Sequence, residues 1–125
     1  MKEIINSPKA PAPIGPYSQA VKSGNTLYVS GQIPIDQERD VLIEGSIEDE
    51  TEQVMKNLSH ILKEAGLTFE NVLKCSIFVS NMKDFARINA VYGQYFKENP
   101  PARETVEVSG LPKGVNVEIS CIASF

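Results

Sequence analysis

The sequence is poor in the residues from which catalytic triads and metal sites are built. Tryptophan is absent, His60 is the only histidine, and Cys75 and Cys121 are the only cysteines among 125 residues. With a single histidine, a Ser-His-Asp or Cys-His triad could form only around that position. No cluster of His, Cys and carboxylate residues has the spacing of metal ligands, and no glycine-rich phosphate loop is present. The sequence therefore predicts a protein that works without a metal ion or a cofactor.

Long apolar runs and basic stretches are also missing. The chain has no run of 18 apolar residues, and residues 1–19 lack the continuous apolar region of a signal peptide. Its 12 Lys and Arg residues are scattered singly and the formal net charge is -4, so we expect neither a membrane nor a nucleic acid as the main partner. Two cysteines far apart in the sequence do not make a disulfide framework, which predicts buried free thiols and a reducing cytoplasm.

What is present indicates one domain, residues 1–125, of the α+β class. Ser46 and Asp49 have the spacing of a helix capping box, and Gly66 is suited to end that helix in a left-handed conformation. Residues 34–46 are expected to form a polar loop. Apolar periodicity predicts a six-stranded sheet with two helices on one face, with strands at 3–5, 17–22, 26–33, 71–80, 103–109 and 115–123 and helices at 46–65 and 84–98.

The first hairpin is expected to carry a polar face. If Gly24-Asn25 forms a two-residue turn, then Val21 opposes Tyr28 and Gln19 opposes Ser30. Ala20, Leu27 and Val29 would then point into the core. The face turned away from the core would carry Tyr17, Gln19, Ser30 and Gln32.

A second polar face is expected near the C-terminus, where Val106 and Val108 alternate with polar residues and the strand after the turn "GLPKG" alternates in the same way. If these two strands pair with their apolar faces together, parity puts Arg103, Thr105, Glu107, Asn116 and Glu118 on the other face. Two helices cannot cover both faces of a six-stranded sheet. The polar face is therefore either covered by other copies of the chain, with Arg103 buried at a subunit boundary, or washed by water with Arg103 as a surface charge.

Four stretches of the sequence, taken together, resemble the RidA (YjgF) family of reactive-intermediate deaminases. They are "GPYSQA", "YVSGQIP", "NAVYGQYF" and "PARETVEVSGLPKGVNVEI", and they occur in the family's order over nearly all of the chain. The resemblance implies a chorismate-mutase-like α+β fold with a mixed sheet, assembled as a homotrimer with active sites in the clefts between subunits. The oligomer agrees with the parity argument, which could not supply the number three.

The resemblance also implies roles for individual residues. Arg103 matches the family's carboxylate-binding arginine and Glu118 its water-positioning acid. Thr105 stands where many members carry Cys, which argues against a thiol-dependent activity, and Glu104 stands beside Arg103 where small residues are common, which bears on substrate preference. The residues expected to bind substrate are Tyr17, Ser30, Gly31, Asn89 and Thr105.

The function implied is that of a 2-iminobutanoate/2-iminopropanoate deaminase. Such an enzyme hydrolyses the enamines and imines released by pyridoxal-phosphate enzymes to 2-keto acids and ammonia, and the chemistry suits a site without metal, because an imine is already electrophilic. One alternative is a trimer that binds 2-keto acids without turnover. Another is an RNA-acting inhibitor of translation, against which the acidic net charge and the position of His60 off the apolar stripe of its helix both count.

Overall fold

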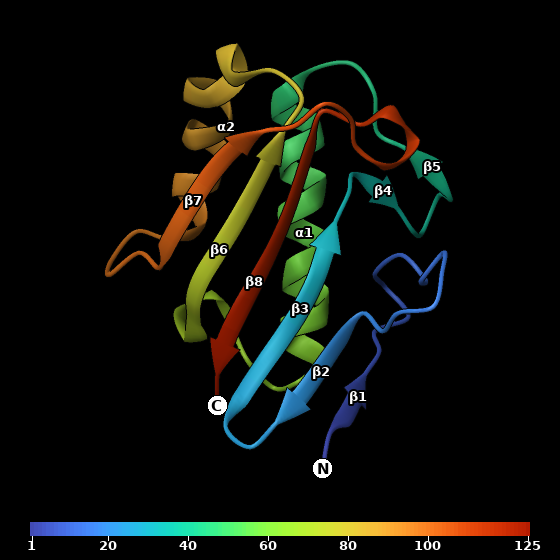
Figure 1. Ribbon diagram of the computed structural model, residues 1–125, viewed down its shortest axis with the longest axis vertical. Coiled ribbons are helices and arrows are strands. Elements are labelled where there is room, and N and C mark those ends of the chain that lie inside the picture. Colours follow the sequence, from blue (N-terminus) through green and yellow to red (C-terminus); the bar gives the residue numbers. More distant parts are fainter.

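A six-stranded mixed sheet with strand order β1-β2-β3-β8-β6-β7 organises the molecule (Figure 1). The computed structural model describes all 125 residues. Only β6 and β7 run parallel, and every other neighbouring pair in this sheet is antiparallel. The strands are β1 Glu3–Ile5, β2 Ala20–Ser23, β3 Thr26–Gln32, β6 Val72–Val79, β7 Ala102–Glu107 and β8 Val117–Ser124.

Both α-helices, α1 (Ile47–Glu64) and α2 (Phe85–Tyr92), lie on the same face of this sheet, as predicted (Figure 1). Their apolar sides meet the inward side chains of the four central strands in one core of 22 buried residues. Leu58 and Ile61 of α1 and Ile77 and Ile119 of the sheet are fully buried in it. The opposite face of the sheet has no layer of its own in this chain (Figure 1).

The ends of α1 form as the sequence predicts. The Ser46 side chain accepts a hydrogen bond from Asp49 N at 3.0 Å, and acidic residues occupy the first turn, where the helix dipole favours them. At the other end Gly66 has φ +79. The Leu67 and Gly66 amides donate to Leu62 O and Lys63 O at 2.8 and 2.9 Å, which is the bonding pattern of a Schellman motif.

The second helix is shorter than predicted. It ends at Tyr92 rather than near residue 98, and a 3₁₀ turn, Gly93–Tyr95, follows it. The tighter turn brings Phe96 against Phe69 and Tyr92, with ring centroids 5.3 and 4.8 Å apart. The apolar periodicity of the sequence continues through this turn and so predicts a longer helix. The packing of the aromatic side chains favours the 3₁₀ conformation instead.

The loop predicted at 34–46 contains a second, two-stranded sheet. β4 (Ile35–Asp36) pairs with β5 (Val41–Leu42), and Asp40 takes a positive φ of 53° in the turn between them. The Asn57 side chain of α1 holds this hairpin, because its amide donates to Ile33 O and Ile35 O at 3.0 and 2.9 Å. The hairpin was missed because its strands are too short for a periodic pattern. No helix of the structure is both long and apolar enough to cross a membrane.

The β2–β3 hairpin has the predicted register, with Val21 opposite Tyr28. The expected polar face is nevertheless wrong at two residues. Gln19 is buried under the N-terminal segment, where its side chain bonds Ser7 N at 2.7 Å and Pro11 O at 3.0 Å. Gln32 is buried on the core side, because a β-bulge inserts one extra residue between Val29 and Gln32 and reverses the alternation of side chains beyond it.

The two C-terminal strands do not pair with each other, which corrects the expectation that they form a hairpin. β6 lies between them, antiparallel to β8 and parallel to β7, so that β6, α2 and β7 form a crossover unit. β7 is consequently an edge strand. Parity relations drawn between residues 103–109 and residues 115–123 therefore do not hold.

Candidate functional site

Arg103 lies on the helix-covered side of the sheet. In the parallel ladder it pairs with Cys75, and Thr105 pairs with Ile77. Residues in register on parallel strands point to the same face, and both β6 partners are buried in the core beneath the helices. The predicted position of Arg103 on the open face is thus wrong. The valine that alternates with it, Val106, points to the open face and is 40% exposed.

The Arg103 guanidinium has no hydrogen-bond or ion-pair partner in the chain. Its Cζ lies 5.5 Å from the ring centroid of Phe85 and 5.0 Å from that of Tyr92, both on α2. The hydroxyls of Thr105 and Tyr92 are also buried without a partner. Burial raises the pKa of Tyr92, so this hydroxyl stays neutral. The half-buried Arg103 guanidinium is therefore an unpaired cation, which is suited to an anionic ligand, while the two hydroxyls lie beneath it in the core.

Asn89 belongs to the same group of residues. It lies one helical turn after Phe85 on α2 and is half-buried. The apolar period of the predicted helix at 84–98 places Phe85 and Tyr92 on its core side, and it gives no sign of their contact with Arg103. Their seven-residue spacing, two turns of one helix face, was the signal that could have indicated a shared partner.

Glu118 lies on the open face of the sheet. It is in register with Phe78 of β6 and leans against Gly31, on the neighbouring strand β3. A Cβ built on Gly31 would lie 2.2 Å from Glu118 Oε2 and 2.8 Å from its Cδ, so only glycine leaves room for this carboxylate. Glu118 has no hydrogen-bond partner, and burial raises its pKa above the usual value. A half-buried carboxylate with a raised pKa is suited to exchanging protons with a water molecule.

Ser30 lies on β3, next to Gly31. Tyr17 lies on the segment that precedes the β2–β3 hairpin. The Ser30 hydroxyl donates to Ser18 O at 2.6 Å, and the Tyr17 hydroxyl accepts from Ile14 N at 3.3 Å. Tyr17 remains 48% exposed. Both Tyr17 and Gly31 line one small pocket. The structure therefore brings four of the predicted site residues into a second group, which consists of Tyr17, Ser30, Gly31 and Glu118.

The two groups do not form one site within a single chain. Arg103, on β7, is in register with Cys75 of β6, and Glu118, on β8, is in register with Phe78 of β6. Phe78 is three residues further along β6 than Cys75, and β7 and β8 lie on either side of β6. Strand geometry then places the Cα atoms of Arg103 and Glu118 roughly 14 Å apart, with the side chains on opposite faces of the sheet. A ligand in contact with Arg103 of one chain cannot also touch Glu118 of that chain.

The open face combines apolar and paired charged side chains. Tyr28 is 51% exposed there, and Glu104 binds Lys74 at 3.2 Å and accepts a hydrogen bond from Ser76. These contacts, with the Ser76 hydrogen bond first, lower the pKa of Glu104. Although Glu104 follows Arg103 in the sequence, its side chain points to the other face, so the two do not share a ligand within one chain.

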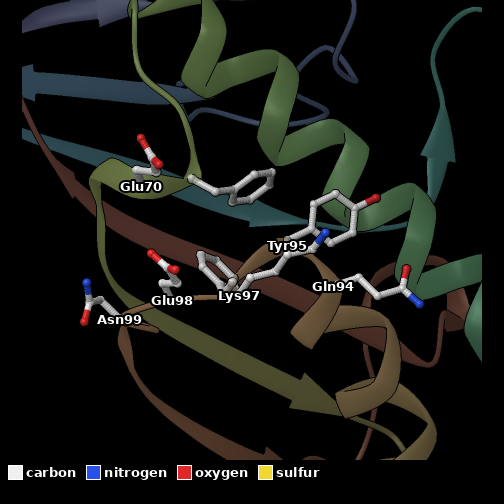
Figure 2. A pocket seen from close by; sticks show the side chains of 8 residues that line it. Glu70, Gln94, Tyr95, Lys97, Glu98 and Asn99 are labelled. Atoms are coloured by element: carbon white, nitrogen blue, oxygen red, sulfur yellow. The ribbon is translucent and has the colours of Figure 1, made fainter.

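The pocket drawn in Figure 2 lies elsewhere, around the turn that ends the α2 segment. It has a volume of about 500 Å³ and combines an aromatic floor with a charged rim, but contains no arginine and none of the predicted site residues. No group of three or more His, Cys, Asp and Glu residues is placed to hold a metal ion. The pocket is lined by Phe69, Glu70, Gln94, Tyr95, Phe96, Lys97, Glu98 and Asn99.

Comparison with known proteins finds relatives over the whole chain. The family model described as endoribonuclease L-PSP matches residues 7–125. A RutC family protein of Pyrococcus horikoshii is 50% identical over 123 residues, which cover 98% of each chain. The human 2-iminobutanoate/2-iminopropanoate deaminase is 44% identical over 123 residues, covering 98% of this chain and 90% of the human protein. The crystal structure of a Rid-family protein of unknown function from Yersinia pestis is 46% identical, covers 100% of both chains and has a TM-score of 0.97.

Proposed function

Because this chain belongs to the RidA (YjgF) family, we propose that it is a deaminase that hydrolyses 2-iminobutanoate, 2-iminopropanoate and their enamine forms to 2-keto acids and ammonia. The observation that carries the proposal is the Arg103 guanidinium, which is held in place yet has no acceptor in the chain. Its natural partner is an anion from outside the chain. A 2-imino acid supplies one in its carboxylate, and the relative from human carries this activity in its name.

Arg103 would bind the substrate carboxylate through two parallel N–H···O hydrogen bonds. This contact orients the substrate and withdraws electron density from the neighbouring imine carbon. Thr105 lies on the same strand face, two residues further along, and would border this half of the site. Asn89 would complete this half of the site from α2.

Glu118 would act on the attacking water. Its carboxylate accepts a proton from the water as the oxygen adds to the imine carbon, and returns it to the imine nitrogen to give a carbinolamine. The carboxylate then takes the hydroxyl proton of the carbinolamine as the C=O bond forms and passes it to the nitrogen, whose bond to carbon breaks so that it leaves as ammonia. Tyr17 and Ser30 would border the substrate from the same side. The reaction needs no metal or cofactor, because the imine is electrophilic by itself and the carboxylate supplies the base.

A complete site requires more than one copy of the chain. We infer a homotrimer with a chorismate-mutase-like arrangement, in which Arg103, Thr105 and Asn89 of one subunit face Glu118, Gly31, Ser30 and Tyr17 of the next. Two observations support it. The two groups lie on opposite faces of the sheet in one chain, and the face that carries Glu118 is uncovered and includes exposed Tyr28 and Val106. We also propose a reducing cytoplasm as the location of the protein. Cys75 and Cys121 are directly opposite each other on β6 and β8, yet both are free thiols.

A second candidate is a trimer that binds 2-keto acids without turnover. It is favoured by the position of Arg103, which can clamp a carboxylate without any help from Glu118. The two functions differ in what Glu118 does, since a carboxylate next to an anionic ligand does not improve binding but does activate a water molecule.

The test couples a serine or threonine dehydratase to the purified protein and follows 2-keto acid formation in time. A deaminase accelerates release of the keto acid above the uncatalysed rate, in proportion to its concentration, and Glu118→Gln removes most of the acceleration while 2-ketobutyrate still binds. Binding of 2-ketobutyrate with no acceleration by the parent protein would favour the second candidate instead.

A further inference from the structure

The contacts of the Arg103 side chain indicate that it is already ordered for carboxylate binding in the absence of a ligand. Its guanidinium lies against two aromatic rings of α2 instead of a carboxylate, at 5.5 Å from the Phe85 centroid and 5.0 Å from the Tyr92 centroid. We propose that Phe85 and Tyr92 form an aromatic seat that positions Arg103 for carboxylate binding. This inference rests on the proposed function and names two positioning residues for it.

The geometry of α2 explains why these two residues can act together. Positions 85 and 92 are seven residues apart, which is two turns of an α-helix, so their side chains project from the same face. That face looks toward β7, where Arg103 is the second residue of the strand. Both ring centroids lie within the distance of about 6 Å over which a ring attracts a cation.

The carboxylate that shares this face of β7 with Arg103 is engaged elsewhere. Glu107 lies four residues further along β7 and on the same face of the strand, but its Oε1 accepts a hydrogen bond from Met82 N at 2.7 Å. This bond holds the turn that leads into α2, Met82–Asp84, and thereby the start of the helix that carries Phe85. The arrangement keeps the acid away from the arginine and fixes the aromatic seat at the same time.

Aromatic contacts have a consequence that an ion pair would not have. A carboxylate partner would occupy two of the five N–H donors of the guanidinium and cancel its charge, whereas a ring leaves the donors at the edge of the guanidinium free. The ligand carboxylate therefore meets a charge that is ordered, unpaired and already partly removed from water. No internal ion pair has to break before binding.

The exposure of the two rings separates their roles. Tyr92 is 5% exposed and belongs to the core, so a change there would also affect folding. Phe85 is 38% exposed and is not part of the buried core. Its replacement leaves little cavity, so Phe85 is the position at which the seat can be tested.

The experiment measures 2-ketobutyrate binding and the KM and kcat of imine hydrolysis for Phe85→Leu, Phe85→Tyr, Arg103→Ala and the double variant Phe85→Leu/Arg103→Ala. Loss of one ring should weaken 2-ketobutyrate binding and raise KM by about 2- to 30-fold, with kcat changed less than about 2-fold, because Arg103 itself remains to bind the carboxylate and polarise the imine once the substrate is bound. Phe85→Tyr keeps a ring and should restore binding. In the Arg103→Ala background, Phe85→Leu should have no further effect.

A matched control is available at Phe125. It is also 38% exposed and its ring also lies under a cation, Lys22 Nζ at 4.1 Å, but it is remote from Arg103 along the sheet. Phe125→Leu should leave binding and KM unchanged. The seat is wrong if Phe85→Leu binds 2-ketobutyrate like the parent, or if its effect persists in full without Arg103. If Arg103→Ala itself binds and hydrolyses as well as the parent, then the proposed function has failed at this site and not merely the seat.

Discussion

Replacement of Gly31 by alanine offers the most direct test of where Glu118 acts. The new methyl group would lie 2.2 Å from Glu118 Oε2, 2.8 Å from Cδ and 3.0 Å from Cγ. All three contacts are with the flexible side chain and none is with the backbone, so the side chain can swing away. Gly31 is not among the glycines with a positive φ, so alanine fits the backbone without strain. The substitution therefore displaces one carboxylate and little else.

The expected change in stability is small. A glycine-to-alanine change at a compatible backbone position stabilises by about 0.4–1 kcal/mol through the unfolded chain. Forcing Glu118 from its rotamer costs a similar amount, about 0.5–1.5 kcal/mol. The two effects nearly cancel, so the free energy of unfolding should stay within about 1 kcal/mol of the parent.

The expected change in activity is much larger. A positioned general base contributes about 10²- to 10⁴-fold to a reaction rate. Displacement leaves the group in the site but out of line with the water, so we expect kcat to fall by about 10- to 100-fold, or about 1.4–2.7 kcal/mol in activation free energy. Binding of 2-ketobutyrate depends on Arg103, in the other group of residues, and should change less than about 3-fold.

The assay is dehydratase-coupled imine hydrolysis with Gly31→Ala, Glu118→Gln and the double variant, beside chemical denaturation of each. The double variant should be no slower than Glu118→Gln alone, because the methyl group acts through the carboxylate that is already gone. Full activity in Gly31→Ala would refute the assignment of Glu118 in this position. An equal loss in the Glu118→Gln background would show that the methyl group blocks the substrate instead.

The remaining predictions address the anion clamp, the assembly, the thiols and pH. Arg103→Ala should lower kcat/KM in steady-state kinetics by roughly 30- to 1000-fold, about 2–4 kcal/mol, and Arg103→Lys should recover only part of this loss, because an ammonium group cannot make two parallel hydrogen bonds to a carboxylate. A folded Arg103→Ala with parental activity would contradict carboxylate binding by Arg103. Light scattering at micromolar concentration should give the mass of about three chains, and a monomer would be incompatible with the shared site. Burial raises the pKa of both Cys75 and Cys121, so a thiol reagent should label them slowly in the native protein and quickly after unfolding. Burial also raises the pKa of Glu118 from 4.5, so the folded state favours the protonated form and loses stability as pH rises from 4.5 through the raised value; denaturation of Glu118→Gln should show a gain over the parent at neutral pH that disappears below pH 4.5.

The parts of the fold that depend on local signals could be predicted from the sequence. Ser46 and Gly66 mark the two ends of α1 through hydrogen bonds made within a few residues, and Gly24-Asn25 sets the register that pairs Val21 with Tyr28. Such contacts involve neighbours in the chain, so residue type and spacing determine them. The six strands of the main sheet followed from the same kind of pattern, although the second begins at Ala20 and not at residue 17.

The face on which Arg103 lies could not be predicted in this way. Parity states only that Arg103 and Val106 point to opposite sides of their strand, and hydrophobicity then assigns the valine to the core. The strand is the edge of the sheet, paired with β6 alone, and its valine points to the uncovered face while the arginine stacks on α2. Long-range pairing decided the orientation, and no short stretch of sequence encodes it. The predicted catalytic pair was therefore placed on one face of one chain, where the structure separates it.

The β-bulge in β3 affects both the core and the site, because it determines which side chains of this strand point inward and which point to the open face. Before Gly31 the odd-numbered residues point inward, and after it the even-numbered Gln32 does so. Deletion of one residue at this point would give a regular strand in which Val29 and Gln32 both still point inward, because the bulge sets three steps of β3 against two of β8. The core would therefore tolerate the shorter strand, whereas the site would lose one of two residues, Ser30 and Gly31, that occupy the place of one in a regular strand, and with it the opening beside Glu118.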